Sequence, residues 1–223
     1  MKPRASTAYT WRAMRGAPST RRFTSEPVDR AALERVLDAA RFAPSGGNRQ
    51  GWRVIVVQAP ETRRALRDLY LPHWRAYLEH SGAAQMLARP EEYDPARVRM
   101  LRSSDEFADR LHEVPLHLVV CVRIADLLIT DGELDRPSIV GGASIYPFVQ
   151  NILLALRAEG LGAALTTLLI PAEPSVKRLL EIPAEMAIAA YILAGRRADP
   201  WPSALRRRAV SEFAFADRYG EPL

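Results

Sequence analysis

The chain has 223 residues, of which 48% are hydrophobic and 26% are charged. This composition is that of a soluble globular protein, and it excludes a disordered chain, a collagen-like repeat and a disulfide scaffold. The net charge of +5 comes from arginine, because Lys2 and Lys177 are the only lysines. Arginine suits a phosphate-bearing ligand and also nucleic acid, although the interleaved acidic residues favour solvated, locally paired arginines.

The sequence has none of the usual marks of a secreted or membrane protein. The single cysteine, Cys121, cannot form an internal disulfide, and it lies in an apolar run where it is most simply a core residue. No apolar run approaches the length of a membrane span, and no apolar stretch follows the basic N-terminus as in a secretory signal. We therefore expect a cytoplasmic protein without membrane attachment.

The N-terminal half is predicted to combine helices with two buried strands. Asp29 is a good N-cap for a helix that ends before the turn at residues 44–48, and a buried strand follows over residues 52–58. Residues 60–112 have a mostly helical pattern and precede a second buried strand over residues 116–124. The predicted breaks in the helical segment are Pro72, Gly82 and Pro90.

The C-terminal half begins with a loop rich in glycine and proline over residues 131–142. It leads into the longest apolar helix, residues 143–159, which is apolar around most of its circumference and ends at Gly160. Such a helix is buried on several sides or lies in a subunit interface. The remaining segments are a strand at 163–169, a short helix opened by Pro174, a strand at 187–195 and an arginine-rich tail at 196–223. Without repeats or linkers, this order predicts one domain, 1–223, of the α/β or α+β class.

Several common catalytic motifs are missing. The sequence has no GxGxxG after a strand, no Walker A motif and no GxSxG elbow. Its four histidines lack metal-ligand spacing, and His73 and His80, seven residues apart, are more simply surface residues. We therefore predict no metal site, and no catalytic dyad is apparent.

Three polar segments stand out instead. They are PSTRRF at residues 18–23, PSGGNRQGW at residues 44–52 and LRRRAVSEF at residues 205–213. Each is weak by itself, because two resemble charged turns and one resembles a glycine loop.

Together and in this order, the segments resemble the nitroreductase family of flavin enzymes. The first resembles the family's RRSxRxF segment, and AARFAPSGGNRQGWRVIVV resembles its helix–PSSxNxQPW–strand block. SIYPFVQNILLALRAEGLGAALTT resembles the family's long central helix and the flavin-contacting strand, and LAGRRADPWPSALRRRAVSEF resembles its GYP…RRPLEEV ending.

The resemblance implies an α+β sandwich, with a mostly antiparallel central sheet flanked by helices. It also implies an intertwined homodimer with the central helix at the interface, and an FMN site shared between the subunits. The residues that match the family's FMN-binding positions are Ser19, Thr20, Arg21, Pro44, Ser45, Gly46, Asn48, Leu165, Thr166, Thr167, Arg206 and Arg207.

Two departures from the family pattern affect this site. Ala17 and Pro18 stand where the family has two arginines, which removes at least one phosphate contact. Arg15 or the triplet 206–208 are candidates to compensate. Gly51 stands where the family has proline and is expected to loosen that turn.

The resemblance implies an oxidoreductase that passes electrons from NAD(P)H through FMN to an electron-poor acceptor, such as a nitroaromatic or a quinone, by a ping-pong mechanism. Residues 70–112 are a variable helical excursion or lid that would choose the substrate. The aromatic residues there either contact the acceptor or are ordinary core residues: Tyr70, Trp74, Tyr77 and Phe107. A flavin-storage protein with little turnover is the alternative, and nucleic-acid binding has only the basic charge in its favour.

Overall fold

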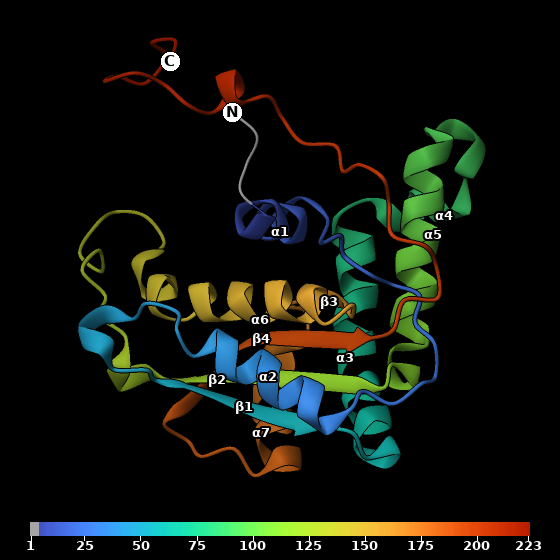
Figure 1. Cartoon of the computed structure of the whole chain (residues 1–223). Coiled ribbons are helices and arrows are strands. Elements are labelled where there is room, and N and C mark those ends of the chain that lie inside the picture. The colour runs from blue at the N-terminus through green and yellow to red at the C-terminus, as the bar shows by residue number, and fades with distance from the viewer. Residues whose placement is uncertain (1–4) are drawn as a thin grey trace.

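An antiparallel sheet of four strands organises the chain (Figure 1). The computed structural model describes residues 5–223, with side chains from Thr10 onward, and residues 1–4 of the predicted domain lie outside the described residues. The strand order is β1-β2-β4-β3, and every neighbouring pair is antiparallel. The strands are β1 Trp52–Val57, β2 Leu116–Arg123, β3 Gly162–Thr166 and β4 Met186–Gly195.

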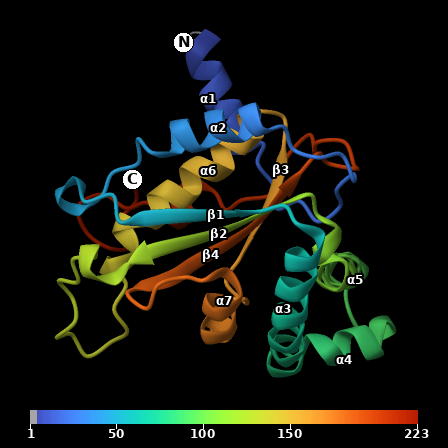
Figure 2. The ribbon, with the colours of Figure 1, turned by 90° about the horizontal axis from the view of Figure 1, so that it is seen from below.

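The two central strands are almost continuously apolar because both of their faces are covered. β2 and β4 are buried along nearly their whole length, whereas β1 and β3 lie at the edges. Helices pack on both faces, and buried side chains form one core on each side of the sheet (Figure 2). The predicted α+β class with an antiparallel sheet between helices is confirmed.

One face of the sheet carries α1 (Ala5–Arg15), α2 (Arg30–Ala40) and α6 (Tyr146–Ala158). Asp29 caps α2 by accepting a hydrogen bond from the Ala32 N–H at 3.2 Å, as its position predicts. Trp52 of β1 stacks on Phe148 of α6 with 4.6 Å between ring centroids, which joins the sheet to this helical layer.

The opposite face carries α3 (Pro60–His80), α4 (Ala83–Ala88), α5 (Pro95–Asp109) and α7 (Glu173–Leu180). Three of the four aromatic residues of the predicted lid, Tyr70, Trp74 and Phe107, are buried in the core on this face. Their burial favours the alternative that they are core residues. Tyr77 is half exposed and stacks against Trp74. Short 3-10 turns lie at Gly46–Asn48, Pro90–Glu92, Leu111–Glu113, Ile124–Asp126, Val140–Ser144, Ile170–Ala172 and Val210–Glu212.

Two helices differ from the sequence-based expectation. α3 continues through Pro72, where a break was predicted, because buried residues on both sides of the exposed proline hold the two halves against one core. The predicted long apolar helix at 143–159 is not confirmed: α6 has 13 residues, and α3, with 21, is longer. Residues 140–144 form a 3-10 turn instead, and Gly160, at φ 75°, ends α6 as predicted.

The last residues form a tail that leaves the body. Figure 1 shows it running from the end of β4 past α5 and then beyond α1. Several of its apolar side chains are largely exposed, among them Phe213 and Tyr219. None of the helices in the described part of the chain combines the length and apolar character needed to cross a membrane.

Candidate functional site

The first predicted motif wraps around the outer edge of β3. Ser19 forms an isolated parallel bridge with Ala163, and the Thr20 N–H donates to the Ala163 carbonyl at 2.8 Å. Thr20 is buried, and its hydroxyl accepts a hydrogen bond from Arg197 at 2.7 Å. A Cβ at Gly162 would lie 2.5 Å from that hydroxyl, so glycine is what lets the segment close onto the strand.

This geometry leaves part of the β3 edge open. Backbone groups of alternate residues point the same way along a strand, and Ala163 points outward toward Thr20. Leu165 therefore presents its N–H and C=O to the same outer edge, beyond the isolated bridge. The Leu165 side chain is 40% exposed. Among the described residues nothing pairs with this backbone donor and acceptor, which belong to the segment that the sequence predicts to contact a flavin.

A cavity of about 230 Å³ lies beside this edge on the side of α6, and we call it the α6-side cavity. It brings Ser19 and Leu165 together, and its one charged residue is Arg157. The remaining walls are apolar. The lining residues are Ala17, Pro18, Ser19, Leu153, Arg157, Leu161, Ala163, Leu165 and Trp201.

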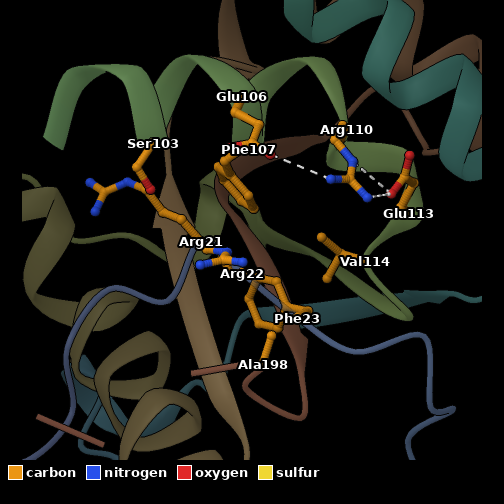
Figure 3. A pocket seen from close by; sticks show the side chains of 10 residues that line it. All are labelled: Arg21, Arg22, Phe23, Ser103, Glu106, Phe107, Arg110, Glu113, Val114 and Ala198. Carbon is orange, nitrogen blue, oxygen red and sulfur yellow. Dashed lines mark hydrogen bonds and ion pairs between the residues drawn. The ribbon is translucent and has the colours of Figure 1, made fainter. Parts of the chain in front are cut away.

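A second cavity, of about 190 Å³, lies on the side of α5 and is called the α5-side cavity (Figure 3). Arg21 lines it, and Figure 3 shows its side chain extending toward Ser103 of α5. Arg110 is neutralised there by Glu106 and Glu113, at 3.4 Å and 2.7 Å. Within the described side chains Arg21 has no ion pair, so its charge is available to an anion.

The Thr166 side chain faces the α5 side of the sheet. Tyr70 lies near both Thr166 and Arg21. Burial raises the pKa of the Tyr70 phenol, while a hydrogen bond with Thr166 and the charge of Arg21 lower it. The Thr166 hydroxyl also accepts a hydrogen bond from the Leu168 N–H at 3.2 Å. Ser19 and Arg21 therefore lie on opposite faces of the β3 edge, and Thr167, which is exposed, directly follows the strand.

The second predicted motif forms a tight turn at the other end of α6. The Ser45 hydroxyl accepts a hydrogen bond from the Gln50 N–H at 3.1 Å, and the Gly46 N–H donates to the Ser144 hydroxyl at 3.0 Å. Asn48 adopts a left-handed conformation with φ 52°, and Pro44 is exposed.

This turn and the β3 edge are far apart within one chain. Ser144 precedes α6, whereas Leu161 of the α6-side cavity follows it. At 1.5 Å per residue, a helix of 13 residues separates them by about 20 Å. One chain therefore does not bring the first two motifs together.

Gly51 does not loosen the turn as the sequence suggested. It is buried, and a Cβ there would lie 2.6 Å from the Cβ of Asp126. The Asp126 side chain occupies the space and is itself held by Arg123 at 2.7 Å. Glycine is required at this position by close packing.

Arg206 and Arg207 are not brought to the other predicted residues. Both are exposed on the tail, and Arg207 donates to the Arg206 carbonyl at 2.7 Å. Within the side chains that the structure describes, neither forms an ion pair. Both guanidinium groups are therefore available to bind an anion.

Sequence reasoning missed two residues at the α6-side cavity. Arg157 and Trp201 lie outside the three polar segments, and neither has a local pattern that marks it as functional. A weak signal existed: Arg157 is the only charged residue of α6, an otherwise largely apolar helix. Nothing in the sequence indicated that Arg157 and Trp201 meet.

The chemistry of this site suits an anionic, planar ligand such as FMN. The Ser19 hydroxyl and the guanidinium groups of Arg157 and Arg21 are hydrogen-bond donors of the kind that bind phosphate oxygens. The apolar walls and the open edge of β3 match a flat ring with polar edge atoms. Among the residues whose side chains are described, no group of three or more His, Cys, Asp or Glu residues is placed to hold a metal ion.

Comparisons of the sequence and of the structure with known proteins point to one family. A model of the nitroreductase family matches residues 14–196. The 5,6-dimethylbenzimidazole synthase of Rhodospirillum rubrum is 31% identical over 183 residues, covering 82% of this chain and 76% of that protein. The NADH dehydrogenase of Thermus thermophilus is 29% identical over 181 residues, covering 81% of this chain and 83% of that protein.

A solved structure has the same fold. A nitroreductase with bound FMN from Desulfitobacterium hafniense aligns with a TM-score of 0.65 at 20% identity, covering 94% of this chain and 98% of that one. The family match includes the first two polar segments and the β3 edge that the site is built on. The chain belongs to the nitroreductase family.

Proposed function

We propose that this protein is an FMN-dependent oxidoreductase that passes electrons from NAD(P)H to an electron-poor acceptor. The observation that carries the proposal is the open edge of β3, flanked by the Ser19 hydroxyl and by Arg157 and Arg21. Neither arginine has a carboxylate partner among the side chains that the structure describes. Membership of the nitroreductase family and the FMN bound in the Desulfitobacterium structure support the cofactor. The name of the Thermus relative supports a nicotinamide reductant.

Each part of the proposed site does a different task. The Ser19 hydroxyl binds the phosphate by donating to its oxygens, and Arg21 adds positive charge from the opposite face of the β3 edge. The backbone of Leu165 donates to and accepts from the edge of the flavin ring, and Thr166 and Thr167 continue that wall. Arg206 and Arg207 add positive charge once the tail is in place.

The turn at residues 44–48 completes the proposed site from a second copy of the chain. Pro44, Ser45, Gly46 and Asn48 lie about 20 Å from the β3 edge of their own chain, across α6. In a homodimer, the turn of one subunit lies against the β3 edge of the other. The turn contributes small residues that permit close approach.

FMN, when bound, would supply the redox chemistry between NAD(P)H and the acceptor. Because reductant and acceptor would occupy one pocket in turn, we propose a ping-pong sequence. The chain's own residues position and shield the reacting groups, so no side-chain acid or base is required. The acceptor is proposed only as a class, nitroaromatics, quinones and similar compounds. We also propose that residues 70–112 act as the lid that selects it.

The test is a spectrum of the purified protein followed by turnover. Bound flavin whose visible bands bleach on anaerobic addition of NADPH or NADH, and sustained oxidation of NAD(P)H with menadione above the rate of free FMN, are the expected results. Bound flavin that supports no turnover would instead identify a storage protein. A protein that takes up no FMN when the cofactor is added in excess contradicts the proposal.

A further inference from the structure

Arg157 is a half-buried cation that has no carboxylate partner among the described side chains. It projects from the last turn of α6 into the α6-side cavity, where it is the one charged lining residue. Within residues 10–223, its contacts are the Gly16 carbonyl, to which Nε donates at 2.7 Å, and the ring of Trp201. Its two terminal nitrogens donate to no group among those residues. Burying such a charge is costly unless an anion compensates it.

The guanidinium of Arg157 is held in a fixed orientation. Its central carbon lies 3.7 Å from the centroid of the Trp201 ring, which is cation–π distance. Arg197 approaches the same ring, with 4.8 Å to the centroid. Arg197 is itself anchored by hydrogen bonds to Thr20 and to the carbonyl of Pro200. Trp201 therefore contacts both arginines and helps to fix where Arg157 points.

Arg197 adds a second positive charge near the cavity, although it does not line it. Burial and the nearby Arg157 lower the pKa of Arg197, while the charge of Asp199 raises it. The cavity lining contains no acidic side chain. The Ser19 hydroxyl is the other polar side chain of the lining, so the cavity offers a hydroxyl and an oriented guanidinium beside apolar walls.

The same cavity contains Ala17 and Pro18, which stand where the family pattern has two arginines. Arg157 reaches the same cavity from α6. Its bond to the carbonyl of Gly16 fastens it to the residue that directly precedes Ala17.

We propose that Arg157 is the phosphate-binding arginine of this protein, supplied from α6 in place of the residues lost at Ala17 and Pro18. Trp201 is the positioning residue that stacks on it. The ligand class is a phosphate monoester whose phosphate is held by Arg157 together with Ser19. The inference rests on the proposed function for the identity of that monoester, FMN.

The first test compares flavins with and without the phosphate. Arg157→Gln is expected to weaken FMN binding about 10- to 100-fold, the value of a hydrogen bond to a charged group, and to leave riboflavin binding unchanged. Arg64→Gln, on the exposed side of α3, removes the same charge far from the cavity and leaves both affinities unchanged. Equal losses for FMN and riboflavin, or no loss for either, would overturn the proposal.

Trp201 is tested by conservative rescue. Trp201→Leu removes the aromatic face and is expected to weaken FMN binding selectively over riboflavin, whereas Trp201→Phe keeps a ring and recovers most of that selectivity. Loss of FMN selectivity in both variants, or in neither, would show that the ring does not orient Arg157.

A last measurement separates this inference from the proposed function. Inorganic phosphate is added to flavin-free protein and the thermal midpoint is recorded. Phosphate stabilises proteins in general, so the expected result is a larger rise for wild type and Arg64→Gln than for Arg157→Gln. If wild type takes up no flavin yet this difference is present, the proposed function fails and the phosphate site stands. An equal rise in all three proteins contradicts the phosphate site.

Discussion

At the scale of single residues, a buried histidine shows how the core sets a protonation state. His117 of β2 is fully buried between the Leu111 carbonyl, 3.1 Å from Nε2, and the Tyr191 hydroxyl, 2.6 Å from Nδ1. A carbonyl only accepts, so Nε2 carries the proton, and Nδ1 of the neutral ring accepts from Tyr191. Burial lowers the pKa of His117 from 6.5 to about 3 and raises that of Tyr191 well above 10, which keeps both groups neutral.

The neutral state of His117 predicts a pH dependence of stability. Between pH 6.5 and about 3, the unfolded chain binds the proton and the native chain does not, so this residue lowers the free energy of unfolding by about 1.4 kcal/mol for each unit that the pH falls. His117→Gln removes this term. Urea unfolding of both proteins from pH 7.5 to 4.5 should show their stability difference narrowing as the pH falls.

The control for His117 is His80→Gln, which changes an exposed histidine. It is unfolded alongside the other two proteins and shows what replacing an exposed histidine does by itself. A stability difference for His117→Gln that does not change with pH would mean that His117 binds its proton equally in the native and unfolded chains.

Gly51 carries a prediction about packing. An added Cβ would lie 2.6 Å from the Cβ of Asp126 and 2.9 Å from its Oδ2, so Gly51→Ala is expected to cost about 1–3 kcal/mol of stability through overpacking. Gly132→Ala is the matched control, because its Cβ would meet only Ile129 at 3.7 Å, an ordinary contact. Denaturant midpoints measure both changes. Equal midpoints for Gly51→Ala and wild type would show that the strand end shifts at little cost.

At the scale of elements, α3 is held together by its buried face despite an internal proline. Pro72 lacks the N–H that would bond the Asp68 carbonyl, and its ring crowds that carbonyl. Leu66, Tyr70, Trp74 and Leu78 are buried at four-residue intervals on both sides of it, and this packing outweighs the local cost. Exposed Pro72 therefore retains a destabilising effect that packing only offsets.

Replacing that proline is expected to stabilise the protein. Pro72→Ala restores a helical hydrogen bond and should raise the free energy of unfolding by about 1–3 kcal/mol. Pro95→Ala is the control, since Pro95 occupies the first turn of α5, where proline is well tolerated. Thermal and urea unfolding report both. A Pro72→Ala variant no more stable than wild type would mean that the helix has already relaxed around the ring.

These elements also show how far the sequence alone reaches. Local signals predicted the Asp29 cap, the four strands to within a few residues and the end of α6 at Gly160. The continuation of α3 through Pro72 was not predicted, because it depends on packing against segments that are distant in the sequence. The role of Arg157 was missed for the same reason: its meeting with Trp201 joins residues 44 positions apart, and no local pattern encodes a contact of that kind.

At the scale of the whole molecule, the position of the tail is the main argument for a second subunit. Beyond Trp201 the tail leaves the body, and the hydrogen bonds of residues 206–223 within the described chain join tail residues to each other. Val210, Phe213 and Tyr219 are exposed. An apolar arm of this kind gains stability only by packing against another surface, and the turn at residues 44–48 needs a second chain to reach the β3 edge.

We therefore expect a homodimer with about twice the 24.9 kDa mass of one chain. We also expect both dimer formation and FMN binding to depend on the tail. Deleting residues 203–223 removes the apolar arm together with Arg206 and Arg207, but it keeps Trp201 and the cavity it lines. Light scattering of the shortened chain should give a larger monomer fraction, and equilibrium dialysis should give weaker FMN binding. A double variant, Arg206→Gln with Arg207→Gln, is expected to weaken FMN binding while remaining dimeric, because it keeps the apolar side chains. A shortened chain that is fully dimeric and binds FMN as tightly as wild type would exclude the tail from both roles.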